Sequence, residues 1–264
     1  MNLFSPHVIT SRFLAIWYRN WVVYLKTWLI SFMPPLLEPI LYIAAFGVGF
    51  RNLIGDVAYH GGSVSYVAFI APALVASGIM NSSFFETTYS SFVRMYYLKT
   101  FDAIMAAPVS VEEVITGEIV WGATRSVMTS IIIAGVLAMF GLISVPWAVM
   151  LVPLALLGGL GFGALGMIFT GVVANIELFN LPSFLLITPM FLFSGTFFPL
   201  DTLPGWAQHV ALALPLTHLT ILARAIGFGY PDDPRLLWSV GYLVVFAAIC
   251  FPIALLLMRR RMVR

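Results

Sequence analysis

The chain has 264 residues, of which 61% are hydrophobic and only 9% are charged. Soluble domains are about 45–50% apolar and about 25% charged, so a single water-soluble core could not bury this much apolar surface. The mean hydropathy of +1.00 therefore indicates lipid as the main solvent. The net charge of +2 is too small to indicate a nucleic-acid partner, and the one cysteine, Cys250, excludes a disulfide framework and a cysteine-based metal site.

Residues 1–27 predict a basic amphipathic helix that lies in the headgroup layer. Arg12, Arg19 and Lys26 recur every seven residues, while aromatic and aliphatic side chains recur at helical spacing on another face. A tryptophan-rich basic helix of this kind is typical of a membrane surface. The segment contains no clean apolar stretch of the kind that a cleavable signal peptide needs.

Residues 28–264 predict an all-α membrane domain with six transmembrane helices. Each apolar run approaches the length that a helix needs to cross about 30 Å of hydrocarbon. The spans are expected at residues 28–50, 66–85, 120–143, 147–173, 179–198 and 236–258.

Two segments between the spans have their own patterns. Residues 86–107 predict an amphipathic helix outside the hydrocarbon, and the capping-box spacing of Ser110 and Glu113 predicts that the next helix begins there. Residues 204–228 hold two apolar stretches that are too short to cross and are punctuated by prolines, which indicates a re-entrant or interfacial segment.

The distribution of positive charges predicts that both termini are cytoplasmic. With the N-terminus inside, ten lysine and arginine residues lie on the cytoplasmic side and three lie outside, which are Arg51, Arg224 and Arg235. The reverse topology would invert that ratio and contradict the positive-inside rule.

Intramembrane features suggest two further roles. Glu38 lies inside the first span between prolines, and an ionisable group there is either a functional site or a water-accessible structural group. Gly159 and Gly163 form a small-xxx-small pair in the fourth span, which favours close packing against another helix.

The chain lacks the sequence patterns of an ATPase or a common hydrolase. No G-x-x-x-x-G-K-[ST] sequence is present, and neither are H-E-x-x-H, G-x-S-x-G or a metal-ligand spacing. We therefore assign no catalytic residue and no metal site. The helix expected at 86–107 is either a plain connection between spans or a docking surface for a soluble partner.

Several motifs resemble the permease subunits of the ABC-2 exporter family, and most closely its nodulation protein J branch. The similarity extends over essentially the whole chain and is carried by the segments at residues 34–39, 84–89, 94–104, 107–110, 117–123, 193–200 and 203–204. Drug and polysaccharide exporters share much of this pattern, so it is more specific for the family than for the branch.

The resemblance implies a non-enzymatic permease that exports a lipo-oligosaccharide across the bacterial inner membrane. It implies a separate ATPase subunit that holds ATP and Mg²⁺, in a complex of two permeases and two ATPases. Residues 86–107 then correspond to the coupling helix, and substrate is expected to pass between the first and fifth spans of the dimer. The implied ATPase contacts are Arg94, Lys99, Thr100, Phe101 and Asp102.

Three rival functions remain open at this stage. The first is ABC-2 export of a drug, a polysaccharide or a haem-like compound. The second is a proton-coupled secondary transporter built around Glu38. The third is a membrane-embedded transferase that uses Asp201, His209 or His218.

Overall fold

The computed structural model describes residues 9–49, 55–59, 62–230 and 235–263. In this part of the chain, six helices are long and apolar enough to cross a membrane. Outside the helices, the described residues form one antiparallel strand pair, β1 (Val57–Tyr59) with β2 (Gly62–Val64). The predicted all-α membrane fold with six spans is confirmed.

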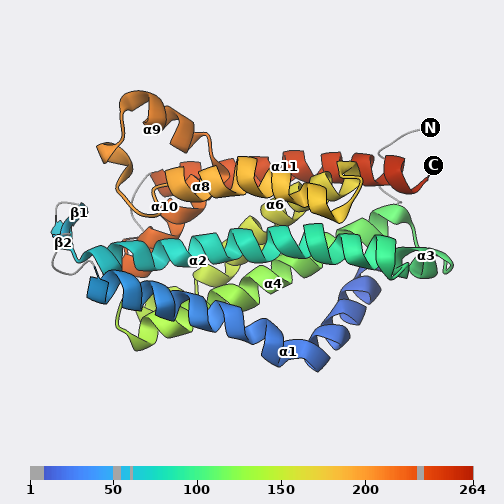
Figure 1. The fold of residues 1–264 in the computed structure, drawn as a ribbon, viewed down its shortest axis with the longest axis horizontal. Helices are drawn as coiled ribbons and strands as arrows, with labels where there is room; N and C mark the ends of the chain where they lie inside the picture. The colour runs from blue at the N-terminus through green and yellow to red at the C-terminus, as the bar shows by residue number, and fades with distance from the viewer. Residues whose placement is uncertain (1–8, 50–54, 60–61, 231–234, 264) are drawn as a thin grey trace.

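The helices form an elongated bundle whose long axis runs from the strand pair at one end to α3 at the other (Figure 1). Helix α2 is the most enclosed span: 78% of its apolar window is buried, against 6% for α1 and 17% for α11. The main core cluster brings together residues of α2, α4, α6, α8 and α10. The outer faces of α1 and α11 are therefore left for lipid or for partners. The long helices are α1 (Phe13–Ala44), α2 (Tyr66–Phe85), α4 (Val111–Met139), α6 (Leu151–Val172) and α11 (Arg235–Met262).

The short helices connect these spans. Helix α2 continues through π-helical turns at Glu86–Ser90 and Val93–Tyr97 before α3 begins. The fifth candidate span combines a 3₁₀ turn at Ile176–Phe179, α7, a π-helical turn at Ser183–Ile187, and α8. The remaining short helices are α3 (Thr100–Met105), α5 (Val145–Ala148), α7 (Asn180–Pro182), α8 (Thr188–Phe193), α9 (Gly205–Leu212), α10 (Pro215–Phe228) and the 3₁₀ turn Leu200–Thr202.

Helix α1 differs from the expected separation into an interfacial helix and a span. It runs without interruption from Phe13 to Ala44 and then through a π-helical turn, although it changes direction sharply along its length (Figure 1). No glycine or proline stands between Phe13 and Pro34, so nothing in the sequence ends the helix near residue 27. Its first turns are fastened to the middle of α4, because Trp17 Nε1 donates to Thr124 Oγ1 at 2.8 Å. That these turns lie in the headgroup layer stays a prediction.

The start of α4 follows its sequence signal. Ser110 caps the helix through a reciprocal capping box with Glu113, with the Glu113 amide 3.1 Å from Ser110 Oγ and the Ser110 amide 2.8 Å from Glu113 Oε2. Thr10 also donates to the Glu113 carboxylate. The cap therefore joins the N-terminal segment to α4, and the helix predicted to start after Ser110 is confirmed.

The end of the chain is fastened at the same end of the bundle. Arg259 forms an ion pair with Glu112 at 3.0 Å, and Arg261 donates to the backbone carbonyls of Thr170 and Val173 at the end of α6. These contacts gather the start of α4 and the ends of α6 and α11 at the end that also carries α3 (Figure 1). That this end faces the cytoplasm stays a prediction.

Helix α6 packs very closely against α2 and α4. A Cβ atom added at Gly159 would lie 2.7 Å from Ala123 Cα, and one at Gly163 would lie 2.7 Å from Ser83 Oγ. Ser83 also donates to the backbone carbonyl of Gly159. The glycines thus lie where three helices approach at backbone distance, a mode of packing that is common in membranes.

At the opposite end, α9 and α10 meet at 86° and form either a broken span or a re-entrant loop. Arg224 of α10 is buried, and its guanidinium lies 3.7 Å from the centre of the Phe69 ring. It donates to the backbone carbonyl of Phe69 at 3.1 Å and to those of Gly195 and Thr196. One arginine therefore ties α10 both to the start of α2 and to the loop after α8. Re-entry of residues 204–228 stays a prediction.

We predict that Arg224→Met destabilises the protein strongly. Methionine keeps the apolar stem but leaves the carbonyls of Phe69, Gly195 and Thr196 without their donor, and each unsatisfied buried group costs about 1–3 kcal/mol. Thermal unfolding in detergent should show a clearly lower Tm than in the control Arg260→Met, because Arg260 is exposed. Equal Tm values in the two variants would contradict the role given to Arg224.

Candidate functional site

The connection between α2 and α4 forms a protruding tip at the end of the bundle. Lys99 adopts a left-handed conformation with φ of 51°, and this residue separates the last turn of α2 from α3. The expected single amphipathic helix at 86–107 is therefore two pieces joined at Lys99. A left-handed conformation costs energy for a residue with a Cβ, so the surrounding contacts must hold the chain in this shape.

The tip exposes a mixed aromatic and charged surface. Tyr96, Tyr97 and Leu98 are 52%, 58% and 63% exposed, and Lys99 and Asp102 beside them are also exposed. The Lys99 ammonium lies 5.3 Å from the centre of the Tyr96 ring. Exposed aromatic residues with a few charges are typical of protein-binding patches. We call these five residues the tip surface.

Three of the five residues expected to contact an ATPase, which are Arg94, Thr100 and Phe101, do not belong to this surface. Phe101 is completely buried in a cluster with Phe92, Ile115 and Phe179, because the amphipathic α3 turns that side chain toward the bundle. The Arg94 side chain is only 14% exposed and is used inside the chain. Among the expected contacts, Lys99 and Asp102 are exposed and Thr100 is half-buried. Their contact with an ATPase stays a prediction.

Arg94 is the centre of a buried cluster of charged groups. Its Nη1 donates to Glu86 at 2.8 Å and its Nε donates to Glu118 at 3.0 Å. Glu118, on α4, is only 1% exposed. It also accepts hydrogen bonds from Ser91 at 2.6 Å and from Asn20 of α1 at 2.9 Å. The cluster therefore connects α1, α2 and α4 through one carboxylate.

Glu86 belongs to the same cluster and connects it to two further residues of α4. Its carboxylate accepts a hydrogen bond from Trp121 Nε1 at 3.0 Å and forms an ion pair with Arg125 at 3.7 Å. The Arg125 guanidinium also lies 4.8 Å from the centre of the Tyr24 ring. The sequence pattern does not pair Glu86 or Glu118 with Arg94. No local spacing reveals this pairing, because the residues come from two helices that the fold brings together.

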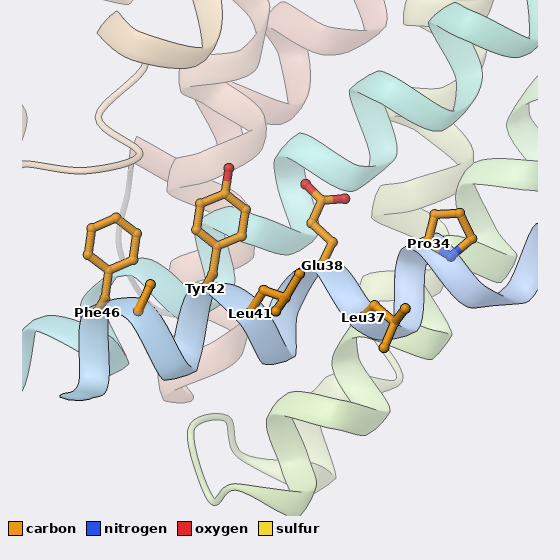
Figure 2. Close-up of a pocket in the computed structure, with 7 residues that line it drawn as sticks. Pro34, Leu37, Glu38, Leu41, Tyr42 and Phe46 are labelled. Carbon is orange, nitrogen blue, oxygen red and sulfur yellow. The ribbon is translucent and has the colours of Figure 1, made fainter. Parts of the chain in front are cut away.

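Glu38 lies on α1 and lines an open apolar groove of about 580 Å³ (Figure 2). The side chains of Glu38 and Tyr42 project from the same side of the helix (Figure 2). Glu38 is exposed and has no acidic, basic or histidine neighbour among the groove residues. The groove is lined by Pro34, Leu37, Glu38, Leu41, Tyr42, Ala45 and Phe46.

The residues considered for a transferase do not form a catalytic constellation in the described part of the chain. Both ring nitrogens of His218 are engaged, with Ser239 Oγ at 3.1 Å and the Leu212 carbonyl at 2.9 Å. His209 Nδ1 is 2.7 Å from the Gly205 carbonyl within its own helix. The described residues contain no group of three or more histidine, cysteine or acidic side chains able to hold a metal ion. His218 therefore acts as a bridge between α10 and α11.

The comparisons with known proteins identify the class of this chain. Residues 11–228 match the model of the ABC-2 type transporter family, so the chain belongs to that family of transporter membrane components. It is 34% identical to nodulation protein J of Rhizobium meliloti (strain 1021), over 95% of this chain and 94% of the relative.

Two further relatives are also similar to this chain over nearly its whole length. The chain is 33% identical to nodulation protein J of Bradyrhizobium diazoefficiens, over 95% of this chain and 94% of the relative. It is 28% identical to the inner membrane transport permease YadH of Escherichia coli (strain K12), over 96% and 97%. The resemblance predicted from the sequence motifs is confirmed.

We predict that Glu118→Gln lowers stability much more than the same change at Glu177. Glutamine keeps the shape of the side chain but removes the charge that balances Arg94, and breaking a buried ion pair costs about 3–5 kcal/mol. Glu177 is exposed near the start of the fifth span, so Glu177→Gln is the control. Thermal unfolding of both variants in detergent is the measurement, and an unchanged Tm in Glu118→Gln would exclude the cluster as a structural centre.

Proposed function

We propose that this chain is the permease subunit of an ATP-driven exporter that moves a lipid-linked oligosaccharide, or a similarly amphipathic molecule, out across the bacterial inner membrane. A separate ATPase subunit supplies the ATP and Mg²⁺ chemistry. The observation that carries the proposal is the combination of the family match with a chain that lacks a phosphate-binding loop. The similarity to nodulation protein J supports the substrate class.

The tip surface is the proposed contact with the ATPase. It protrudes from the bundle at the end that carries the first turns of α1 and the last turns of α11 (Figure 1). Both chain ends and the tip would face the cytoplasm, where ATP is found. Tyr96, Tyr97 and Leu98 would supply contact area, and Lys99 and Asp102 would set the orientation of the partner through their charges.

Movement of the tip would reach the spans through two rigid connections. The Phe101 ring is enclosed by residues of α2, α4 and the start of the fifth span, so α3 cannot shift without displacing them. Arg94 and Glu118 join the end of α2 to α4, and Asn20 extends that connection to α1. A closure of the ATPase dimer would thus be converted into a rocking of helices. In this scheme Arg94 and Phe101 transmit force, and the exposed tip residues receive it.

The exposed face of α1 is the proposed side of the transport path. Two copies of this chain, with two ATPases, would bring the first and fifth spans together around it. A carboxylate that faces hydrocarbon is costly, so Glu38 is expected to face a water-containing path in the dimer. The apolar groove beside it suits the acyl portion of a lipid-linked cargo. The sugar head would then travel near Glu38 while the tail remains in lipid.

We predict that Asp102→Lys weakens ATPase binding at least about tenfold, which corresponds to about 1.4 kcal/mol. The variant reverses an exposed charge without touching the buried core. The tagged permease should then recover much less ATPase on purification in mild detergent, and ATP-driven transport of lipo-oligosaccharide in proteoliposomes should fall in parallel. Asp201→Lys is the control, because Asp201 is also exposed but lies outside the tip.

Two outcomes would count against these assignments separately. If Asp102→Lys retains as much ATPase as Asp201→Lys, the tip surface is not the docking site. If the isolated permease drives uphill transport without any ATPase, the exporter function itself is wrong. Transport that stops when the proton gradient is collapsed, with ATP present, would support the proton-coupled alternative instead.

A further inference from the structure

A second pocket lies between the first half of α1 and the charged ends of α2 and α4. It is open, has a volume of about 410 Å³, and is separate from the groove at Glu38. Three of its lining residues are arginines and one is a glutamate. The lining residues are Arg19, Asn20, Val23, Tyr24, Thr27, Ser31, Glu86, Tyr89, Ser90, Val93, Arg94, Leu98, Trp121 and Arg125.

The charges around the pocket do not balance. The three arginines Arg19, Arg94 and Arg125 stand against the two carboxylates of Glu86 and Glu118, which leaves an excess of one positive charge. Glu118 is included in this count although it does not line the pocket, because it lies behind Arg94 and pairs with it. A site with this balance attracts an anion.

The donors of these two arginines are only partly used. Arg19 donates from Nη1 to Asn20 Oδ1 at 2.9 Å and has no carboxylate within ion-pair distance in the described residues. Arg125 Nε is buried and has no hydrogen-bond acceptor, since its approach to Glu86 at 3.7 Å is too long for a hydrogen bond. Arg19 and Arg125 both line the pocket, so the remaining N–H groups of their guanidinium groups can meet an acceptor that occupies it.

The expected depth of the pocket in the membrane indicates which kind of anion it binds. The residues of α2 from Tyr66 to Phe85 contain no charged side chain, and twenty helical residues span about 30 Å, the thickness of the hydrocarbon. Glu86 and Arg94 therefore lie just beyond it, among the headgroups. Trp121 and Tyr24 line the pocket at the same level, as aromatic anchors do at this depth. Val23 and Val93 give it an apolar wall that can contact a glycerol and the first acyl carbons.

From these observations we propose that the pocket binds the phosphodiester of an anionic phospholipid, with Arg19 and Arg125 as the phosphate ligands. Guanidinium groups bind phosphate through paired hydrogen bonds. The bound lipid would join the first half of α1 to α2 and α4 next to the Arg94 cluster. The site does not depend on which cargo the protein exports.

The test uses the purified full-length chain in a non-ionic detergent. Native mass spectrometry would measure binding of phosphatidylglycerol, phosphatidylcholine and diacylglycerol. We expect phosphatidylglycerol to bind at least about tenfold more tightly than phosphatidylcholine and to raise the Tm, and diacylglycerol to bind weakest. Equal binding of phosphatidylglycerol and phosphatidylcholine would overturn the proposal without the use of any variant.

Matched double variants locate the site. The double variant Arg19→Gln with Arg125→Gln should weaken phosphatidylglycerol binding about tenfold or more. The control, Lys26→Gln with Arg260→Gln, removes two exposed cations that lie outside the pocket. This control should change the affinity for phosphatidylglycerol less than about twofold. Equal losses in both pairs would show that the lipid responds only to overall charge. Displacement of the lipid by excess inorganic phosphate would show that the site takes free phosphate, which would overturn the lipid assignment.

Discussion

The ion pair between Arg94 and Glu118 is the interaction on which the half of the fold that carries α3 depends. Glu118 is nearly inaccessible and receives hydrogen bonds from α1 and α2 while belonging to α4. A buried charge is tolerated only when it is paired and its remaining hydrogen-bonding capacity is satisfied. The three helices are therefore held at one mutual position wherever this cluster is intact. That position also fixes the tip, because Arg94 stands a single helical turn before the residues that protrude.

The cluster lies at a particular depth for a physical reason. Helices α2 and α4 each have a charged end and an uncharged remainder, with α2 free of charge up to Phe85 and α4 free of charge from Ser126. In α1 the basic residues end at Lys26, and Glu38 is the one charge after it. From these lengths we expect the charged ends to meet at the boundary between hydrocarbon and headgroups, where water and lipid phosphates lower the cost of burial. Ion pairs can thus transmit motion there without lying in the low-dielectric centre of the bilayer.

Much of this arrangement could be predicted from the sequence, because it follows from composition and periodicity. Six apolar runs of spanning length define the membrane fold, and the Ser110–Glu113 spacing defines the start of α4. The burial of Phe101 and the pairing of Arg94 could not be predicted this way. Periodicity shows that a helix has two faces but does not show which face meets the bundle, and an ion pair between separate helices leaves no local spacing. The motif resemblance predicted a coupling segment but gave no means to separate its exposed residues from those that pack inside the bundle.

The distribution of burial shows which surfaces a single copy of the chain leaves exposed. Helix α2 is enclosed and the glycine-rich α6 packs closely against its neighbours, while most of α1 remains open and carries Glu38 beside an apolar groove. A lipid-facing carboxylate without a partner would be a persistent cost to a solitary subunit. The same group becomes inexpensive when a second subunit encloses water between the two faces. The asymmetry between a tightly packed interior and an open first helix is therefore what the proposed path between two subunits requires.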